Sequence, residues 1–93
     1  MRKEVIMKPL VLPHVNLNGT SRECLVEQQC SVLHVLNSLL KVMGDASPNG
    51  RDYQTAPMGT FTKAQEAWRE RWQMIEDLRR EIEEYALAIQ DSK

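Results

Sequence analysis

The chain has 93 residues, of which 42% are hydrophobic and 27% charged, and its 12 basic and 13 acidic side chains give a formal net charge of −1. This length corresponds to one small domain (1–93), and small domains often complete their core by oligomerising. The balanced charge excludes the basic field that drives nonspecific DNA binding, so no DNA partner is expected. No apolar run approaches the ~20 residues of a membrane span and no signal-peptide core is present, which predicts a cytoplasmic protein without a membrane partner.

The first segment, residues 4–18, is rich in β-branched and aliphatic side chains and is interrupted by Pro9 and Pro13. Its end, from His14 to Asn18, alternates polar and apolar residues as a half-buried strand does. Because proline cannot donate to a sheet ladder, it is confined to edge strands or strand ends. We predict short β strands here, paired within the chain or across a dimer.

A first helix is predicted over residues 20–43. Thr20-Ser-Arg-Glu23 has the form of a capping box, and Gly44 is a typical residue to follow a helix end. One row of side chains on this helix has heptad spacing, with one polar member: Leu25, Gln29, Val32, Leu36, Leu39 and Met43. A second apolar row lies beside it: Val26, Leu33 and Leu40. This face is wider than one partner helix covers, which predicts one contact inside a hairpin and another between subunits.

A loop is predicted over residues 45–59, which contain Pro48, Gly50, Pro57 and Gly59. About fifteen residues is longer than the roughly two to eight usual between helices, and such loops are generally functional or disordered. Pro-Asn-Gly at residues 48–50 is sufficient to turn the chain. The polar and aromatic residues that follow it exceed what a turn requires and suggest a functional loop.

A second helix is predicted over residues 61–90, starting at Thr60 or Thr62, because Thr62-Lys-Ala-Gln65 has the form of another capping box. Its seam is spaced by alternating steps of four and three residues: Ala64, Trp68, Arg71, Ile75, Leu78, Ile82, Tyr85 and Ile89. Acidic residues interleave with Arg79 and Arg80 in the manner of a solvated face with i, i+4 pairs. The predicted fold is therefore mainly α, an oligomeric antiparallel two-helix hairpin with a short N-terminal β unit.

The loop supplies most of the candidate ligand-binding residues: Asn49, Arg51, Asp52, Tyr53 and Gln54. The guanidinium of Arg51 suits a phosphate, and a ring beside a cation suits stacking on a base. The amide and carboxylate groups can read the polar edge of a nucleobase. The structural alternative is that Arg51 and Asp52 form only a loop salt bridge or an Asx-type turn.

Three further arginines are candidates. Arg71 occupies a seam position among apolar neighbours, so either its stem packs while its head reaches water, or it holds a phosphate at the mouth of a pocket. Arg69 lies on a different face and would join that site only through the loop or another chain. Arg22 lies at a helix start, where free backbone amides bind anions, and it is otherwise solvated.

The aromatic residues of the second helix have a structural and a binding interpretation. Trp68 and Trp72, at i and i+4, are expected in a core or interface, with a ligand-stacking platform as the alternative. Phe61 is well placed as a hydrophobic staple before the second helix.

Catalytic signals are absent from the sequence. His14 and His34 are isolated, and Cys24 and Cys30 lie about 120° apart on the predicted helix, which disfavours a disulfide. No Ser–His–Asp or Cys–His grouping, metal-ligand cluster or phosphate-binding glycine loop with its lysine occurs. We expect no enzymatic activity, no metal and no cofactor.

The chain resembles the Thoeris anti-defence sponge family of phage proteins over residues 14 to about 90. The resemblance lies in His14-Val-Asn-Leu-Asn-Gly-Thr-Ser-Arg-Glu23, a helix, Pro48-Asn-Gly-Arg-Asp-Tyr53 and a long charged helix. Members of this family sequester cyclic ADP-ribose signals intact. The resemblance implies a short sheet and two antiparallel helices, assembled as dimers or as a hexamer (a trimer of dimers), with pockets at subunit boundaries.

In that family an aromatic ring stacks on adenine and arginines hold the phosphates. The resemblance assigns these roles to Tyr53 or Phe61, Arg51, Arg69 and Arg71. It further implies that Asn49 or Asp52 reads polar edges, and that Arg22 is the candidate for a second site that binds cyclic oligonucleotides.

The function expected from these observations is that of a phage anti-defence protein in the host-cell cytoplasm. It binds and sequesters cyclic ADP-ribose isomers without cleaving them, and cyclic oligonucleotides are the further candidate ligands. One alternative is a protein-interaction inhibitor that uses the apolar helical face, and another is a structural phage protein whose loop only turns the chain. A DNA-binding regulator ranks last, because a basic face is missing.

Overall fold

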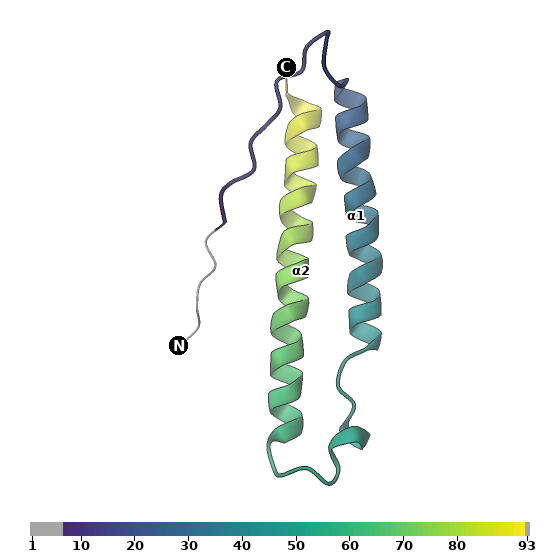
Figure 1. Cartoon of the computed structure of the whole chain (residues 1–93), viewed down its shortest axis with the longest axis vertical. Coiled ribbons are helices and arrows are strands. Elements are labelled where there is room, and N and C mark those ends of the chain that lie inside the picture. The colour runs from purple at the N-terminus through teal and green to yellow at the C-terminus, as the bar shows by residue number, and fades with distance from the viewer. Residues whose placement is uncertain (1–6, 93) are drawn as a thin grey trace.

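The computed structural model describes residues 7–92. Helix α1 (Arg22–Asp45) and helix α2 (Thr60–Asp91) lie side by side and antiparallel, joined by a loop that contains a short 3-10 helix, η1 (Gly50–Tyr53) (Figure 1). The predicted two-helix hairpin is confirmed. The molecule is a rod with principal extents of 63 × 28 × 17 Å. Neither helix is both long and apolar enough to cross a membrane.

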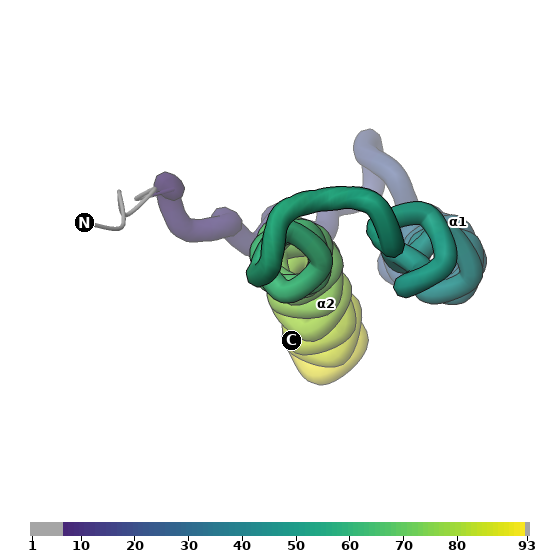
Figure 2. The backbone as a smooth tube through the Cα atoms, turned by 90° about the horizontal axis from the view of Figure 1, so that it is seen from below, coloured from purple at the N-terminus to yellow at the C-terminus, as the bar shows by residue number. Residues whose placement is uncertain are grey.

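Residues 7–15 form an extended arm instead of the predicted β unit. The arm turns at the end of the hairpin away from the loop and runs back along α2, on the side opposite α1 (Figures 1 and 2). The Tyr85 hydroxyl ties it down by donating to the Val11 carbonyl at 2.9 Å. No strand occurs in residues 7–18, so strand pairing within the chain is wrong there; residues 4–6 lie outside the described residues. Pro9 and Pro13 remove two ladder donors, and no second strand lies beside the arm among residues 7–92.

A compact turn connects the arm to α1. The Asn16 side chain accepts from the Asn18 amide and donates to the His14 carbonyl, both at 3.0 Å. The Gly19 amide donates to the Asn16 carbonyl at 3.2 Å. Asparagine thus replaces the missing backbone partners of this turn with its own side chain, as it does in Asx-type turns.

Both predicted capping boxes are wrong. Ser21, not Thr20, caps α1 by accepting from the Cys24 amide at 3.2 Å, so the helix covers 22–45 instead of 20–43. Helix α2 starts at Thr60 after Gly59, whose φ of 89° is left-handed, and it has no side-chain cap. The Thr60 amide donates to the Pro57 carbonyl at 3.1 Å. This turn brings the chain into helical geometry before Thr62 could act as a cap.

The hairpin has a thin core. Leu36 and Leu40 of α1 and Ala86 and Ile89 of α2 are its buried hydrophobic side chains, and only Ile89 is fully enclosed. The row of α1 that faces α2 combines residues from both predicted rows. Gln29, Leu36 and Met43 come from the heptad row, and Val26, Leu33 and Leu40 come from the row beside it. The predicted seam through Val32 and Leu39 is wrong for those two residues, which are exposed. The row facing α2 keeps Gln29, Leu36 and Met43 of the predicted seam and takes the next residue at the other three places, which is a rotation of about 50° around the helix axis.

A polar cluster interrupts the middle of α2. Arg79 makes a two-pronged hydrogen bond to Glu76, at 2.9 and 2.8 Å, and reaches Glu83 at 2.8 Å; Arg80 binds Glu76 at 3.1 Å. Arg79 is two turns beyond Trp72 and therefore shares its helix face. The Glu76 side chain is only 12% exposed, so this part of the predicted solvated face is partly covered. The hydrogen bond from Arg79 lowers the pKa of Glu76 to about 2.

Candidate functional site

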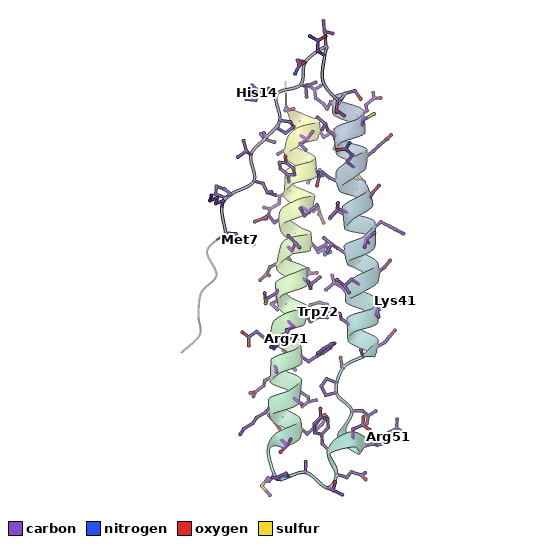
Figure 3. All side chains as sticks on the ribbon, viewed as in Figure 1. Met7, His14, Lys41, Arg51, Arg71 and Trp72 are labelled. Atoms are coloured by element: carbon purple, nitrogen blue, oxygen red, sulfur yellow. The ribbon has the colours of Figure 1, made fainter. Side chains whose placement is uncertain are left out.

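Two tryptophan side chains join α2 to the end of α1. The Trp68 indole N–H donates to the Met43 carbonyl at 2.7 Å, and the Trp72 indole N–H donates to the Leu40 carbonyl at 3.1 Å. The last carbonyls of a helix lack partners within the helix. The Ser47 amide binds Gly44 and not Met43, so Trp68 satisfies a carbonyl that the helix end leaves free. Both rings are thereby held in place, and Figure 3 shows Trp72 pointing from α2 toward α1.

A cleft of about 410 Å³ opens beside these rings. One wall comes from the end of α1 and the turn after it, and the other from the first half of α2. Its lining residues are Gly44, Ser47, Pro48, Gln65, Trp68, Arg69, Trp72 and Gln73. Ser47 is held by a hydrogen bond from its hydroxyl to the Gly44 carbonyl at 2.7 Å. The absence of a side chain at Gly44 and the ring of Pro48 keep this wall low and apolar.

Arg69 is the one charged side chain of the lining. Its guanidinium makes no hydrogen bond or ion pair with any part of the chain that the structure describes, so its five donors are available. Gln73, on the rim, donates from its amide nitrogen to Asp77 at 2.8 Å and keeps its amide oxygen free. Gln65, Arg69 and Gln73 succeed one another at steps of four residues and so follow one stripe of α2.

The cleft is suited to binding. Two indole rings offer apolar surface for a flat group, the guanidinium offers a bidentate partner for a phosphate or carboxylate, and the amides offer donors and acceptors. No acid, histidine or cysteine is among its lining residues. Within residues 7–92, no group of three or more histidine, cysteine or acidic side chains could hold a metal ion.

The predicted loop residues lie next to the cleft but are organised mainly around the loop itself. The Asn49 side chain caps η1 by accepting from the Arg51 amide at 2.9 Å, so the Asx-type turn of this loop is made by Asn49 and not by Asp52. Tyr53 packs on Phe61, with ring centroids 5.5 Å apart and planes tilted by 32°. Arg51 lies on the outer side of the loop and points away from α2 (Figure 3). Asp52 and Gln54 are exposed on the same short segment.

Gly50 explains how the two rings come together. A Cβ atom on Gly50 would meet the edge of the Phe61 ring at 3.5 Å, so the loop backbone lies directly against this ring. Phe61 therefore packs on the loop that precedes α2; because α2 already starts at Thr60, Phe61 lies inside the helix and the staple interpretation is wrong. The ring pair closes the loop, and the Tyr53 ring is half-buried.

The three arginines outside the loop are not brought together. Arg69 lines the cleft, whereas Arg71 is exposed and donates to the Ala67 carbonyl of its own helix at 2.9 Å. Arg22 begins α1, and Gly44, near the other end of α1, lines the cleft; they are about 33 Å apart along the helix. The buried Nε atom of Arg22 has no partner within the described residues.

The sequence interpretation missed most of the cleft. It assigned binding to Arg69 but not to Gln65 or Gln73, and it placed the tryptophans first in a core. A signal was present, because residues 65, 69 and 73 form a polar stripe at i, i+4 steps beside two tryptophans spaced in the same way. The α1 wall had no such signal, since Gly44, Ser47 and Pro48 resemble ordinary helix-terminating residues.

No protein-family model, curated protein or solved structure matches the chain.

Proposed function

We propose that this chain is a non-catalytic binding module that sequesters a small anionic nucleotide. The ligand class is a cyclic nucleotide signal, a cyclic ADP-ribose isomer or a cyclic oligonucleotide, held intact in the cytoplasm of a phage-infected host. The observation that carries the proposal is the cleft, which combines two fixed indole rings with one uncommitted guanidinium.

Each part of such a ligand has a counterpart in the cleft. The base lies against the indole surface, where stacking contributes roughly 1–3 kcal/mol per base. A phosphate binds Arg69, whose planar guanidinium fits two phosphate oxygens. Gln65 and the free amide oxygen of Gln73 bind polar edges of the base. A volume of about 410 Å³ lies within the range of small-molecule pockets, about 300–1,000 Å³.

The loop extends the cleft. Pro48 lines it, and Asn49 to Gln54 follow directly, so a ligand larger than the cleft reaches the exposed polar groups of this segment. In this arrangement Tyr53 and Phe61 support the loop and Arg51 binds a second phosphate after its side chain turns inward. Arg71 and Arg22 lie outside the cleft, and a second ligand site at Arg22 would be independent of the first.

The proposal is tested by thermal-shift and calorimetric titration with cyclic ADP-ribose isomers and cyclic di- and trinucleotides. A ligand at ~100 times its dissociation constant stabilises the native state by ~2.7 kcal/mol. Loss of a charge-assisted hydrogen bond costs about 1.5–3 kcal/mol, so Arg69→Gln is expected to weaken binding roughly 10- to 100-fold. The ligand should be recovered unchanged after denaturation of the protein.

Arg71→Gln is the matched control, because it removes the same group two residues away and outside the cleft. Equal losses in both variants would contradict the cleft as the binding site. Arg51→Gln separates the loop from the cleft, since binding that depends on Arg51 and not on Arg69 places the ligand on the loop alone. Turnover of the ligand at catalytic protein concentrations would contradict sequestration.

The alternative is a protein-interaction inhibitor, favoured by exposed apolar residues on α1 such as Val35 and Val42. It predicts that a host protein is retained by the wild-type chain and by Arg69→Gln equally well, and that no nucleotide shifts the melting temperature.

A further inference from the structure

An uncovered apolar row lies along the second half of α1. Its members are Val32, Val35, Leu39 and Val42, which are 42%, 64%, 40% and 61% exposed, and we call this row the outer strip. The steps of three, four and three residues place them on one face of the helix. The arm covers α2 on the side away from α1, so no described part of the chain covers the outer strip (Figures 1 and 2).

The side of α1 that carries the outer strip has no charged residue. The charged residues of this helix are Arg22, Glu23, Glu27, Lys41 and Asp45. At 100° per residue, each lies about 100° or more around the axis from the centre of the strip. Water-facing sides of surface helices are normally polar and charged. This face therefore has the composition of a buried helix face.

The angle between the two apolar rows of α1 matches that of a four-helix bundle. Each residue of the outer strip directly precedes one that faces α2: Leu33, Leu36, Leu40 and Met43. One residue corresponds to about 100° around the axis. A helix in a four-helix bundle contacts two neighbours at roughly a right angle, through two such heptad rows. The hairpin supplies one neighbour, and the position of the second is empty.

The exposed area is large enough for a second chain. The accessible surface is 8026 Å², whereas a compact protein of this mass exposes about 5,500 Å². The extended arm accounts for part of the roughly 2,500 Å² excess. A standard interface buries ~800 Å² on each partner, which is less than this excess.

We propose that the outer strip is the contact surface for a second copy of this chain, α1 against α1, so that two hairpins form a four-helix bundle. Two-fold symmetry brings the same surface of each copy together. An uncharged strip meets its own copy without like-charge repulsion. A row that contained a charged residue, as the seam of α2 contains Arg71, would place two like charges near each other in such a pair.

The two clefts remain open in this dimer. Gly44, which lines the cleft, is nine residues from Val35, or about 180° around α1. The dimer contact and the cleft therefore occupy opposite sides of this helix. Each copy keeps its own cleft, and one ligand is expected per chain. The dimer does not depend on the ligand, so the two proposals can fail separately.

Sedimentation velocity and light scattering on the full chain, from micromolar to submillimolar concentrations, test the dimer. The wild-type chain is expected to have the mass of a dimer or of an even-numbered assembly, and Val35→Glu that of a monomer. The matched control is Asn37→Glu, which adds the same charge at an exposed position on the opposite side of α1 and should keep the wild-type mass. A monomeric wild-type chain, or a Val35→Glu variant with unchanged mass, would overturn the proposal.

Disulfide trapping keeps the test decisive if Val35→Glu fails to fold. In a Cys24→Ser/Cys30→Ser background, Val35→Cys/Leu39→Cys should give a covalent dimer on mild oxidation. The two cysteines allow pairing whether the two α1 helices run parallel or antiparallel. Asn37→Cys in the same background should stay uncrosslinked. The reverse pattern, or dimers that disperse only when the arm is truncated, would place the contact elsewhere and refute the α1 pairing.

Discussion

At the scale of single residues, side chains near the cleft form hydrogen bonds with the backbone that are present without a ligand. Trp68 satisfies the Met43 carbonyl and Asn49 satisfies the Arg51 amide. These hydrogen bonds hold the cleft wall and the loop in one geometry in the absence of a ligand. A site organised in advance loses less conformational entropy on binding, which favours affinity. The Arg69 guanidinium makes no such hydrogen bond among the described residues, so substituting Arg69 should change binding without disturbing the backbone.

Glu76 should make the stability of the hairpin depend on pH in the acid range. The hydrogen bond from Arg79 lowers its pKa from about 4.5 to about 2, so between these values the unfolded chain binds the proton and the folded chain does not. Its stabilising effect is therefore complete above about pH 4.5 and is lost as the pH falls toward 2. Glu76→Gln should have a flatter dependence of Tm on pH in this window, measured by circular dichroism. Glu84→Gln, at an exposed position, should keep the wild-type slope, and equal slopes in wild type and Glu76→Gln would contradict the assignment.

At the scale of elements, the two helices are long and regular, and the connection between them depends on one backbone conformation. Gly59 has a φ of 89°, and the Thr60 amide binds the Pro57 carbonyl across it. Helix α2 has no side-chain cap, so this turn and the packing of Phe61 on Tyr53 and Gly50 set the direction in which α2 starts. The position of the cleft follows from that direction, because Gln65 and Trp68 lie within the first turns of α2.

Two glycine substitutions should therefore change stability in opposite directions. Gly59→Ala places a Cβ on a left-handed residue and is expected to destabilise by about 1–2 kcal/mol. Gly44→Ala lies in the last turn of α1, where an added Cβ meets nothing within 4 Å, and is expected to stabilise by about 0.5–1 kcal/mol. Urea denaturation of both variants measures the difference. A Gly59→Ala variant as stable as the wild type would show that the turn tolerates another conformation.

At the scale of the whole molecule, the single chain is more extended than a compact domain of its length. Its radius of gyration is 18.7 Å, whereas a compact domain of this length has about 12 Å. Only four hydrophobic side chains are buried in the described hairpin. A rod with so thin a core is expected to gain most of its stability by pairing its exposed apolar surface with that of another copy.

The melting temperature should accordingly rise with protein concentration, because association stabilises the folded chain by mass action. Differential scanning calorimetry over a wide concentration range measures this dependence. Val35→Glu should remove it, and Asn37→Glu should leave it unchanged. A Tm that is independent of concentration in the wild-type chain would indicate that the hairpin is stable by itself.

Much of the fold could be predicted because it depends on local pattern. The two helices end within two residues of their predicted limits, since apolar periodicity and the Pro-Gly loop are local signals; Gly44, predicted to follow the first helix, lies inside its last turn. The caps could not be assigned in the same way. Ser21 and Thr20 are both good N-cap residues, and the choice depends on the backbone conformation that the preceding turn imposes.

What the sequence by itself determined is a mainly α hairpin, a polar loop and an α1 face too apolar for a single partner, all of which follow from residue spacing. Only the tertiary structure decided that the arm lies along α2 without strand pairing, which of the neighbouring rows faces α2, and that Arg69 and the tryptophans line a cleft with Pro48. These features join residues more than twenty positions apart. Such contacts depend on how two helices are rotated against each other, and a rotation of about 50° changes which residues of α1 face α2, although the sequence and its apolar spacing are the same.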